Sequence, residues 1–288
     1  MKIIWYNFFD RYNKENTMTE NEKLLHGKNA VYTNTVEHED IYSIMRCGDT
    51  FTSSEGIPLE YRIFVPYDYD ETKKYPLLLS MHGAGEEFMK DEEFVSSSMR
   101  VLCNLFNLKN SPITQAVIIC PRCPQEPGGK KWVNAEWSDG CFDMDKAETP
   151  WIRAVLELAG DIEKRYSIDA DRRYIGGLSM GGFATWYLIS RYTELFAGAI
   201  AICGGADVRA AEKLRDFPVY TAHGAQDDTV PVEGTRAMVK ALRDAGSTKV
   251  HYREIPDGDH IVWHAVTQDP TAINWLFEQR LSDRKGKL

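Results

Sequence analysis

The sequence lacks the excess of positive charge that binding to nucleic acid or to an anionic membrane requires. It has 34 Lys and Arg against 43 Asp and Glu, which gives a formal net charge of −9 at pH 7. A polyanionic partner would therefore be repelled. The sequence also lacks an apolar run near the roughly 20 residues that span a bilayer. We predict no nucleic-acid partner and no membrane partner.

The beginning of the chain lacks a recognisable export signal. The apolar stretch 1–6 is too short for the core of a signal peptide, and no cleavage site of small residues follows it. Because residues 7–23 are mostly polar, translation could also start at Met18. We expect residues 1–40 to be an N-terminal extension, flexible or partly an upstream segment, and residues 41–288 to form a single domain. The expected location is cytoplasmic.

Cysteine is scarce, and its spacing gives no disulfide framework. The chain has 6 cysteines, of which Cys120 and Cys123 form a Cys-x-x-Cys pattern. Zinc would need a second pair of ligands, and a redox motif usually opens a helix, which Pro121 and Pro124 prevent here. We therefore predict buried thiols or thiols in loops.

The sequence does contain an alternation of buried strands and amphipathic helices. Continuous apolar runs, typical of strands buried on both faces, recur at 76–81, 116–120, 173–176, 197–202, 218–222 and 250–255. Helical periodicity lies between them, at about 150–166, 180–192, 233–245 and 270–282. Before the first run, residues from about 40 to 66 carry the signals of antiparallel strands. This order predicts an α/β domain with a mostly parallel, doubly wound sheet flanked by helices.

The segment 174–183 predicts a short strand that turns sharply into a helix, with Ser179 at the turn. Ser179 is the centre of a Gly-x-Ser-x-Gly pattern, in which Gly177 and Gly181 remove side chains that would collide across the turn. A serine hydroxyl is a poor nucleophile unless a base takes its proton, and this turn holds it where an imidazole can reach it. Ser179 is therefore the candidate nucleophile.

The loop after the first apolar run supplies candidate donors for an oxyanion. Ligands of such a sheet bind beyond the carboxyl ends of its strands, so this loop, His82-Gly83-Ala84-Gly85, should lie near Ser179. Its glycines let backbone amides face a cavity. We expect the N–H groups of Ala84 and Met180 to form an oxyanion hole, and His82 to hold the loop rather than to act as a base.

The loops after the last two apolar runs supply the candidate acid and base. Asp227 or Asp228 could lie against a histidine and fix its tautomer, and Asp228 fits a solvated turn better. Asp207 is a third candidate acid. His260 stands on a polar, glycine-bearing loop and is the predicted base, whereas His264 is expected to begin the closing helix.

With these motifs the chain resembles an α/β-hydrolase of the esterase branch. That branch groups carbohydrate esterase family 1 (feruloyl and acetyl-xylan esterases), polyhydroxybutyrate-depolymerase-like esterases and the serine peptidases of the prolyl-oligopeptidase group. The resemblance covers about residues 55–282. Its carriers are the serine motif, His82-Gly83-Ala84-Gly85, Pro121-Arg122-Cys123-Pro124 before Trp132, His223-Gly224 with Asp227 and Val230-Pro231, and Gly258-Asp259-His260 before Trp263.

The resemblance implies the α/β-hydrolase fold and a catalytic domain. The family's acid is the third residue after His-Gly, which selects Asp227 over Asp228. Its oxyanion donors correspond to Ala84 and Met180. The resemblance further implies hydrolysis of carboxylic esters without a metal or an organic cofactor.

The expected function is hydrolysis of small or carbohydrate-linked esters, such as feruloyl or acetyl esters, through Ser179, His260 and Asp227. The expected partner is thus a small-molecule or oligosaccharide ester. The alternatives are a serine peptidase or amidase of short peptides, and an acyltransferase or a non-catalytic binding protein of the same fold. The sequence does not indicate an oligomeric state.

Three tryptophans are candidates for contact with the substrate. Trp132 and Trp137 belong to the segment 125–145, which could cover the site as a partial lid, and Trp263 lies close behind His260. Their rings could stack on a sugar or on an aromatic acyl group, or equally could fill the wall of the cleft.

Overall fold

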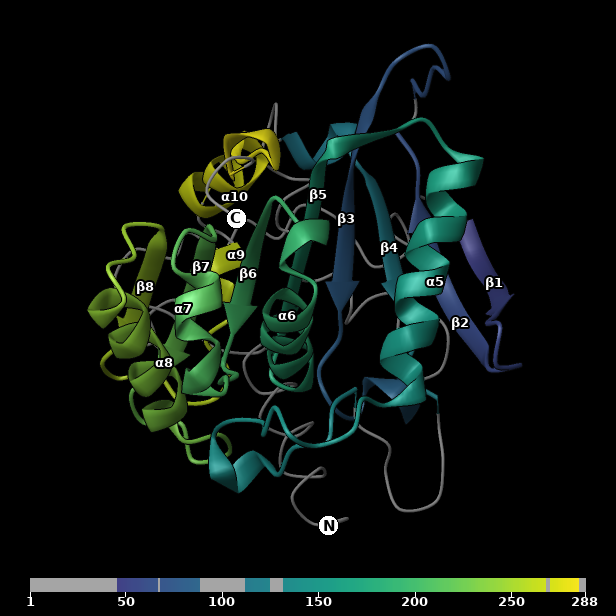
Figure 1. Ribbon diagram of the computed structural model, residues 1–288. Coiled ribbons are helices and arrows are strands. Elements are labelled where there is room, and N and C mark those ends of the chain that lie inside the picture. The colour runs from purple at the N-terminus through teal and green to yellow at the C-terminus, as the bar shows by residue number, and fades with distance from the viewer. Residues whose placement is uncertain (1–45, 67, 89–111, 125–131, 268–269, 285–288) are drawn as a thin grey trace, which may run out of the picture. The chain divides into compact units, whose positions relative to one another are not determined.

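The computed structural model describes residues 46–66, 68–88, 112–124, 132–267 and 270–284 (Figure 1). These residues belong to one unit of the chain, Val36–Leu288. The predicted N-terminal extension, 1–40, lies outside the described residues, so its nature stays a prediction.

The described strands form a single eight-stranded sheet with the order β1-β2-β4-β3-β5-β6-β7-β8. β1 and β2 pair antiparallel, β2 and β4 also pair antiparallel, and every other neighbouring pair is parallel. The prediction of an antiparallel entry into a parallel sheet is therefore confirmed. The strands are β1 (Arg46–Thr52), β2 (Pro58–Phe64), β3 (Tyr75–Met81), β4 (Val117–Pro121), β5 (Ile168–Leu178), β6 (Gly198–Ile202), β7 (Val219–Gly224) and β8 (Val250–Ile255).

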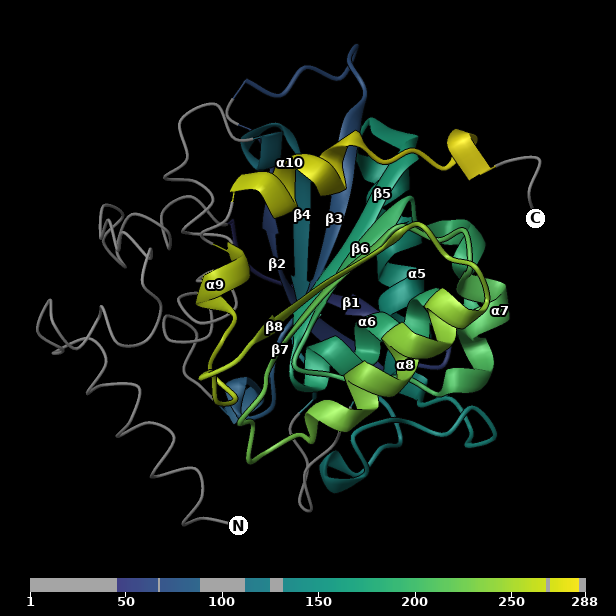
Figure 2. The same ribbon diagram turned by 90° about the vertical axis from the view of Figure 1, so that its left-hand side faces the viewer.

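The apolar runs of the sequence become strands because helices cover both faces of the sheet. Every residue of β3, β4 and β6 is buried, as the continuous apolar runs predict. Figure 2 shows α5, α6, α7 and α8 on one face and α9 and α10 on the other. The helices are α5 (Pro150–Arg165), α6 (Met180–Arg191), α7 (Ala211–Leu214), α8 (Val232–Asp244), α9 (His264–Thr267) and α10 (Pro270–Glu278).

Two helices illustrate how the sequence sets their ends and their faces. α5 begins after Thr149, whose side chain accepts the Ile152 N–H, and Pro150 occupies its first turn. α10 ends at Glu278, four residues before the predicted end at 282. It ends early because the following residues bond to β5 instead: the Leu281 N–H donates to the Asp171 carbonyl.

The parallel register brings the carboxyl ends of five strands to one edge of the sheet. Met81 of β3 lies opposite Gly177 of β5, and Leu178 lies opposite Ile202, the last residue of β6. The end of β7 continues this row, since Gly224 lies opposite Ile255, the last residue of β8. The loops that follow these strands therefore meet at this edge.

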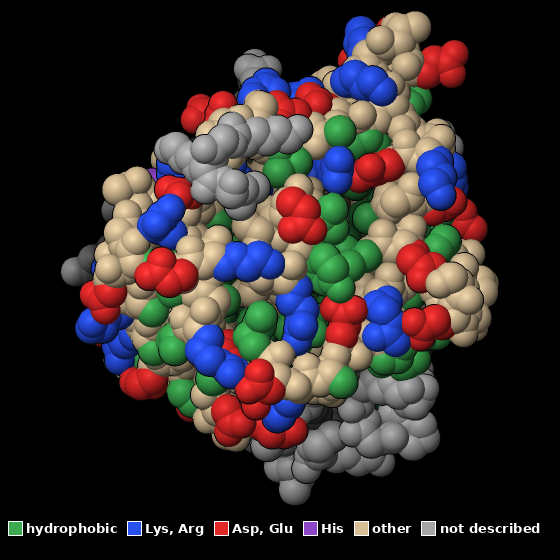
Figure 3. Space-filling view, in the orientation of Figure 1, with side chains coloured by type: hydrophobic (Ala, Val, Ile, Leu, Met, Phe, Trp, Pro, Cys, Tyr) green, Lys and Arg blue, Asp and Glu red, His purple; other side chains and the backbone are tan. Residues whose placement is uncertain are grey.

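The charge of the surface and the length of the helices relate to the predicted absence of nucleic-acid and membrane partners. On the face shown in Figure 3, basic and acidic side chains are interspersed, and the described residues form no extended patch of one sign there. Within the described part of the chain, no helix has both the length and the apolar character needed to cross a membrane. The absence of nucleic-acid and membrane partners and the cytoplasmic location stay predictions.

Candidate active site

Ser179 lies in a strained turn between β5 and α6. Its φ of 53° and ψ of −119° belong to the left-handed side of conformational space, which a residue with a side chain rarely adopts. The Ser179 N–H donates to the Ile202 carbonyl of β6 at 2.8 Å, and the Ser179 carbonyl accepts the Phe183 N–H at 3.0 Å. These bonds hold the turn, and the Ser179 side chain is left half-exposed at the sheet edge.

The two glycines of the serine motif are required because three backbone segments meet at the turn. A Cβ on Gly177 would lie 2.5 Å from the Gly181 carbonyl oxygen and 2.7 Å from that of Met81. A Cβ on Gly181 would collide with the carbonyl oxygens of Met81 and His82. The predicted collision across the turn is therefore present, and the end of β3 takes part in it as well.

The structure brings Ser179, His260 and Asp227 together in one chain of contacts. His260 Nε2 lies 2.9 Å from Ser179 Oγ, and His260 Nδ1 lies 2.7 Å from Asp227 Oδ2. A carboxylate can only accept, so Nδ1 carries the ring proton and Nε2 presents its lone pair to the serine hydroxyl. This tautomer is the one that a base for Ser179 needs.

The carboxylate of Asp227 is held from both of its oxygens. Oδ1 accepts the backbone N–H groups of Thr229 at 2.9 Å and Val230 at 2.8 Å, and Oδ2 contacts His260 and His223. Burial by itself raises the pKa of Asp227, but the hydrogen bonds from the two histidines and from Val230 outweigh it, and the net pKa lies well below the usual range. Asp227 is therefore ionised when His260 needs a counter-charge.

The other candidates for acid and base lie elsewhere. Asp228 is exposed, and its carboxylate accepts the Thr229 hydroxyl in the turn. Asp207 caps a short helix and pairs with Arg209. His264 begins α9, as expected for the closing helix.

The loop after β3 lies directly against the turn that carries Ser179. A Cβ on Gly83 would lie 2.7 Å from the Leu178 side chain. The Gly83 and Gly85 N–H groups already donate to carboxylates of their own loop. Among the described residues, none accepts the Ala84 N–H. The Met180 N–H, at the start of α6, has no partner within the helix.

His82 fixes the conformation of this loop as a neutral imidazole. Its Nε2 accepts the Cys123 N–H at 2.9 Å, so Nδ1 must carry the proton that it shares with the Gly83 carbonyl at 2.7 Å. Burial, with the nearby Arg122 adding to it and the Gly83 carbonyl opposing it, lowers the pKa of His82 to about 4. His82 has no contact with Ser179, and its bonds agree with the predicted role of holding the loop.

Trp132 differs from the expectation drawn from the sequence. Its side chain is fully buried, its Nε1 donates to the His82 carbonyl at 3.3 Å, and its ring lies edge-on to that of His82 at 5.2 Å. A ring without exposed area cannot stack on a substrate. Trp132 therefore supports the loop of His82 from behind, and we correct its predicted role accordingly.

The described part of the segment 125–145 is tied down rather than free to move as a lid. The Met144 N–H donates to Asp207, and Arg209 pairs with both Asp143 and Asp145 at 2.7 Å. Arg191 of α6 donates to the Met144 carbonyl at 2.6 Å. Residues 125–131 lie outside the described residues. The contacts of residues 143–145 therefore join this segment to α6 and to the loop after β6.

Trp137 and Trp263 pack against residues of α6 and against His260, respectively. Trp137 is half-buried, and its ring lies 5.3 Å from that of Phe183, in the first turn of α6. Trp263 is largely buried and stands edge-on to the His260 ring at 6.1 Å. Their role in substrate binding stays a prediction.

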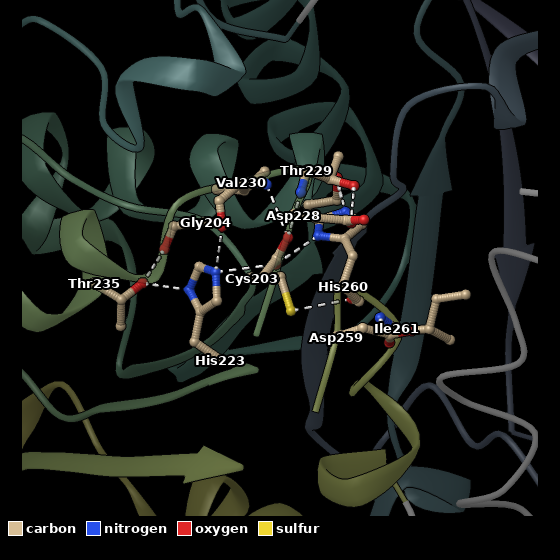
Figure 4. A network of polar contacts seen from close by, with 12 residues as sticks. Cys203, Gly204, His223, Asp228, Thr229, Val230, Thr235, Asp259, His260 and Ile261 are labelled. Carbon is tan, nitrogen blue, oxygen red and sulfur yellow. Dashed lines mark hydrogen bonds and ion pairs between the residues drawn. The ribbon is translucent and has the colours of Figure 1, made fainter. Parts of the chain in front are cut away.

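Two residues beside the site were missed by reasoning from the sequence. His223, at the end of β7, contacts Asp227, and the Cys203 thiol, after β6, donates to the His260 carbonyl at 3.4 Å (Figure 4). Ligand atoms of Cys203, His223 and Asp227 lie within 4.8 Å of one another. Each already has a hydrogen-bond partner in this network, and a metal ion there would have to break those bonds.

The described cysteines agree with the prediction of buried thiols. Cys120, Cys123 and Cys203 are buried and Cys141 is half-buried, and all four are thiols outside any disulfide. Burial raises the pKa of the Cys120 thiol to about 12, so it is neutral and unreactive.

Comparison with known proteins identifies the family. Residues 70–271, more than half of the chain, match the model of the phospholipase/carboxylesterase family. The chain belongs to this family. The predicted α/β-hydrolase fold and the resemblance to the esterase branch are thereby confirmed.

Solved structures of esterases resemble this family member. It is 34% identical to a thermostable esterase, with a TM-score of 0.71 over 83% of this chain and 64% of that one. It also resembles the feruloyl esterase module from Clostridium thermocellum, with a TM-score of 0.56 over 87% and 93% of the two chains. The identity to that module is 17%, so the likeness shows the fold alone.

Curated relatives of this family member include both esterases and peptidases. It is 31% identical over 125 residues to the bifunctional acetylxylan esterase/xylanase of Neocallimastix patriciarum. The matched region covers 40% of this chain and 18% of that protein. It is 23% identical over 246 residues to dipeptidyl aminopeptidase A of Saccharomyces cerevisiae. That match covers 74% of this chain and 25% of the yeast protein. The chain thus spans a quarter or less of the length of these relatives.

Proposed function

We propose that this protein hydrolyses small or carbohydrate-linked carboxylic esters, such as acetyl or feruloyl esters, through an acyl-enzyme on Ser179. The observation that carries the proposal is the unbroken chain of contacts from Ser179 Oγ to His260 Nε2 at 2.9 Å and from His260 Nδ1 to Asp227 Oδ2 at 2.7 Å. The strained turn at Ser179 and membership of a carboxylesterase family support the same conclusion.

In the first half of the reaction, Ser179 Oγ attacks the carbonyl carbon of the ester while His260 Nε2 takes its proton. Asp227 stabilises the positive charge that develops on the imidazole. The N–H groups of Ala84 and Met180 bind the oxygen of the tetrahedral intermediate. His260 then gives the proton to the departing alcohol, and the acyl group stays on Ser179.

In the second half, water takes the place of the alcohol. His260 Nε2 accepts a proton from the water as its oxygen attacks the acyl carbon, and the same N–H groups bind the second oxyanion. Collapse of this intermediate returns the proton to Ser179 Oγ and releases the acid. All these steps use side chains and backbone groups of this chain.

The serine is tested with Ser179→Ala and an aryl acetate such as p-nitrophenyl acetate. The variant should lose about 10³-fold or more of kcat/KM, since the nucleophile is gone and only binding and backbone donors are left. Ser247→Ala, in the turn before β8, is the matched control and should keep its activity. Equal loss in both variants, or retained turnover in Ser179→Ala, would remove Ser179 from the proposal.

A covalent label gives a second test of the acyl-enzyme. A fluorophosphonate should add to the peptide that contains Ser179 in the wild-type protein and should add to no peptide in Ser179→Ala. Labelling of another serine would place the nucleophile elsewhere.

The peptidase and acyltransferase alternatives are tested with one panel of substrates. Peptidase relatives exist, but a peptidase must also expel an amine, which is a poorer leaving group than an alcohol. We expect hydrolysis of p-nitrophenyl acetate and methyl ferulate to exceed that of an aminoacyl anilide. Faster cleavage of the anilide would favour a peptidase, and formation of a new ester in the presence of added alcohol would favour an acyltransferase.

A further inference from the structure

His223 is a second histidine on the carboxylate of Asp227, and the reaction steps above do not use it. His223 is the second-last residue of β7, and its side chain has no exposed area. Figure 4 shows its ring directed toward Thr235 and the loop that follows β7. His223 Nδ1 lies 2.7 Å from Thr235 Oγ1. His223 Nε2 lies 3.0 Å from the Val230 carbonyl oxygen and 3.1 Å from Asp227 Oδ2.

These contacts decide where the proton of His223 lies. The Val230 carbonyl and the ionised Asp227 carboxylate can only accept hydrogen bonds, so Nε2 must carry a hydrogen. A bare lone pair between two acceptors would be buried, unpaired and repelled. Thr235 Oγ1 can accept or donate, and it also lies 3.0 Å from the Gly204 carbonyl. It therefore orients the ring without fixing the state of Nδ1.

The shared oxygen links His223 to the proposed base. Asp227 Oδ2 accepts from His260 Nδ1 at 2.7 Å and from His223 Nε2 at 3.1 Å, while two backbone N–H groups occupy Oδ1. The four acceptor positions of the carboxylate are thereby filled. A donor on Oδ2 withdraws negative charge from the oxygen that His260 also uses.

We propose that His223 is a positioning residue that acts on the reaction through Asp227. Its Nε2–H holds Asp227 Oδ2 in line with His260 Nδ1 and limits how strongly the carboxylate stabilises the protonated His260. This inference rests on the proposed function, because it assigns His223 a task within the triad of Ser179, His260 and Asp227.

The sign of the effect follows from this arrangement. Without the His223 N–H, Oδ2 keeps more negative charge and stabilises the His260 imidazolium more strongly. His260 then holds its proton up to a higher pH. Because only the neutral imidazole can act as base, the acidic limb of the kcat/KM profile should move to higher pH.

Other titratable groups face this network, and His223 makes only a minor charge contribution to one of them, Glu254. Burial, with the Asp227 charge adding to it, raises the pKa of the Cys203 thiol well above its usual range, so the thiol stays neutral. Hydrogen bonds from Arg236 and Tyr252 hold Glu254 ionised. The other facing groups are Asp259 and His260 in the loop after β8 and Ser179 in the turn after β5.

Two substitutions separate the Nε2–H from the rest of the His223 side chain. In His223→Gln the amide nitrogen can take the place of Nε2 and still donate to Asp227. In His223→Asn the shorter side chain reaches only the place of Nδ1, beside Thr235, and the donor to Asp227 is lost. Both remove the ring, so a role in packing alone would affect both alike.

The experiment measures kcat/KM for p-nitrophenyl acetate as a function of pH in the wild-type protein and in both variants. We expect His223→Asn to move the acidic limb upward by about half a pH unit or more, since a hydrogen bond to a charged group is worth about one pKa unit on its acceptor. His223→Gln should bring the limb back toward its wild-type position. Equal shifts in the two variants, or no shift in either, would overturn the inference.

A double-mutant cycle tests whether the effect runs through Asp227. In an Asp227→Asn background, His223→Asn should produce no further shift of the limb. A shift of the same size as in the wild-type background would overturn the inference.

Nuclear magnetic resonance of the wild-type protein decides the matter if the variants do not fold. With ¹⁵N-labelled histidine, the Nε2 of His223 should be protonated, and its signal should change over the same pH range in which kcat/KM rises. An unprotonated Nε2 would overturn the inference. Failure of the proposed function is a separate outcome, recognised by esterase activity that is absent or survives in Ser179→Ala.

Discussion

The neutral state of His82 predicts a specific loss of stability in acid. Burial lowers the pKa of His82 in the folded protein to about 4, from an ordinary value of 6.5. The unfolded chain therefore binds a proton at this residue at a higher pH than the folded protein does. The stability that neutral His82 contributes is fully present above pH 6.5, and it is lost as the pH falls toward 4.

The magnitude follows from the difference between these two pKa values. At pH 4.5 the unfolded state is almost fully protonated at His82 and the folded state is mostly neutral, which amounts to about 2–3 kcal/mol. Protonation in the folded state would also cost the bond from the Cys123 N–H to Nε2. The loop that carries Ala84 should then loosen as the protein is acidified.

The assay compares urea unfolding of the wild-type protein and His82→Gln at pH 7 and at pH 4.5. Glutamine can accept the Cys123 N–H but cannot titrate. Its variant lacks the Nδ1–H that His82 shares with the Gly83 carbonyl, and it should therefore be less stable at pH 7. The stability gap should shrink by about 2–3 kcal/mol at pH 4.5, because only the wild-type protein titrates at position 82 and the carboxylates cancel in the difference. His251→Gln, at an exposed position, controls for the loss of one histidine. A gap that is the same at both pH values would refute the argument.

Four other substitutions test separate parts of the molecule. Asp227→Asn should lower kcat for an aryl acetate about 10³- to 10⁴-fold, because the amide favours the wrong tautomer of His260; an unchanged kcat would exclude Asp227 from the triad. Gly160→Ala, where an added Cβ on α5 meets nothing within 4 Å, should raise the free energy of unfolding by about 0.5–1 kcal/mol. Gly181→Ala, whose Cβ would collide with the end of β3, should instead unfold the turn; similar unfolding curves for both variants would contradict the account of this turn. Trp137→Ala should raise KM for methyl ferulate about two- to tenfold and leave KM for p-nitrophenyl acetate nearly unchanged; equal changes in both would argue against stacking.

Local patterns in the sequence predicted the elements of the fold well. The apolar runs became strands, since a strand with helices on both sides must be apolar on both faces. α5 begins at Pro150, as the helical periodicity predicted, and Thr149 caps it. The end of α10 was predicted less well, because Leu281 and Ser282 leave the helix to bond with Asp171 of β5. Such a long-range competitor has no local signal.

The sequence predicted those residues of the candidate site whose role depends on their neighbours in the chain. The serine motif indicated a strained turn, and its glycines are the positions where no Cβ fits. Trp132 was misjudged, because a tryptophan in a polar segment reads as exposed, whereas its ring is buried against His82. Burial of this kind depends on which segments pack over it.

The choice between Asp227 and Asp228 also depends on packing that the sequence does not reveal. From residue types alone the two neighbouring carboxylates are equivalent. The structure turns Asp227 inward, where two backbone N–H groups and two histidines meet it, and leaves Asp228 in solvent. The resemblance to esterases selected the same residue, but without this physical reason.

The sequence by itself predicted the class of chemistry, because a nucleophile on a strand-to-helix turn needs particular residues in a short stretch. The tertiary structure alone decided the network around that nucleophile. Ser179 and His260 are 81 residues apart, and only the register of the parallel strands brings their loops to one edge of the sheet. The contact of His223 with Asp227 was likewise decided by packing, since it depends on a loop that folds back over the end of β7.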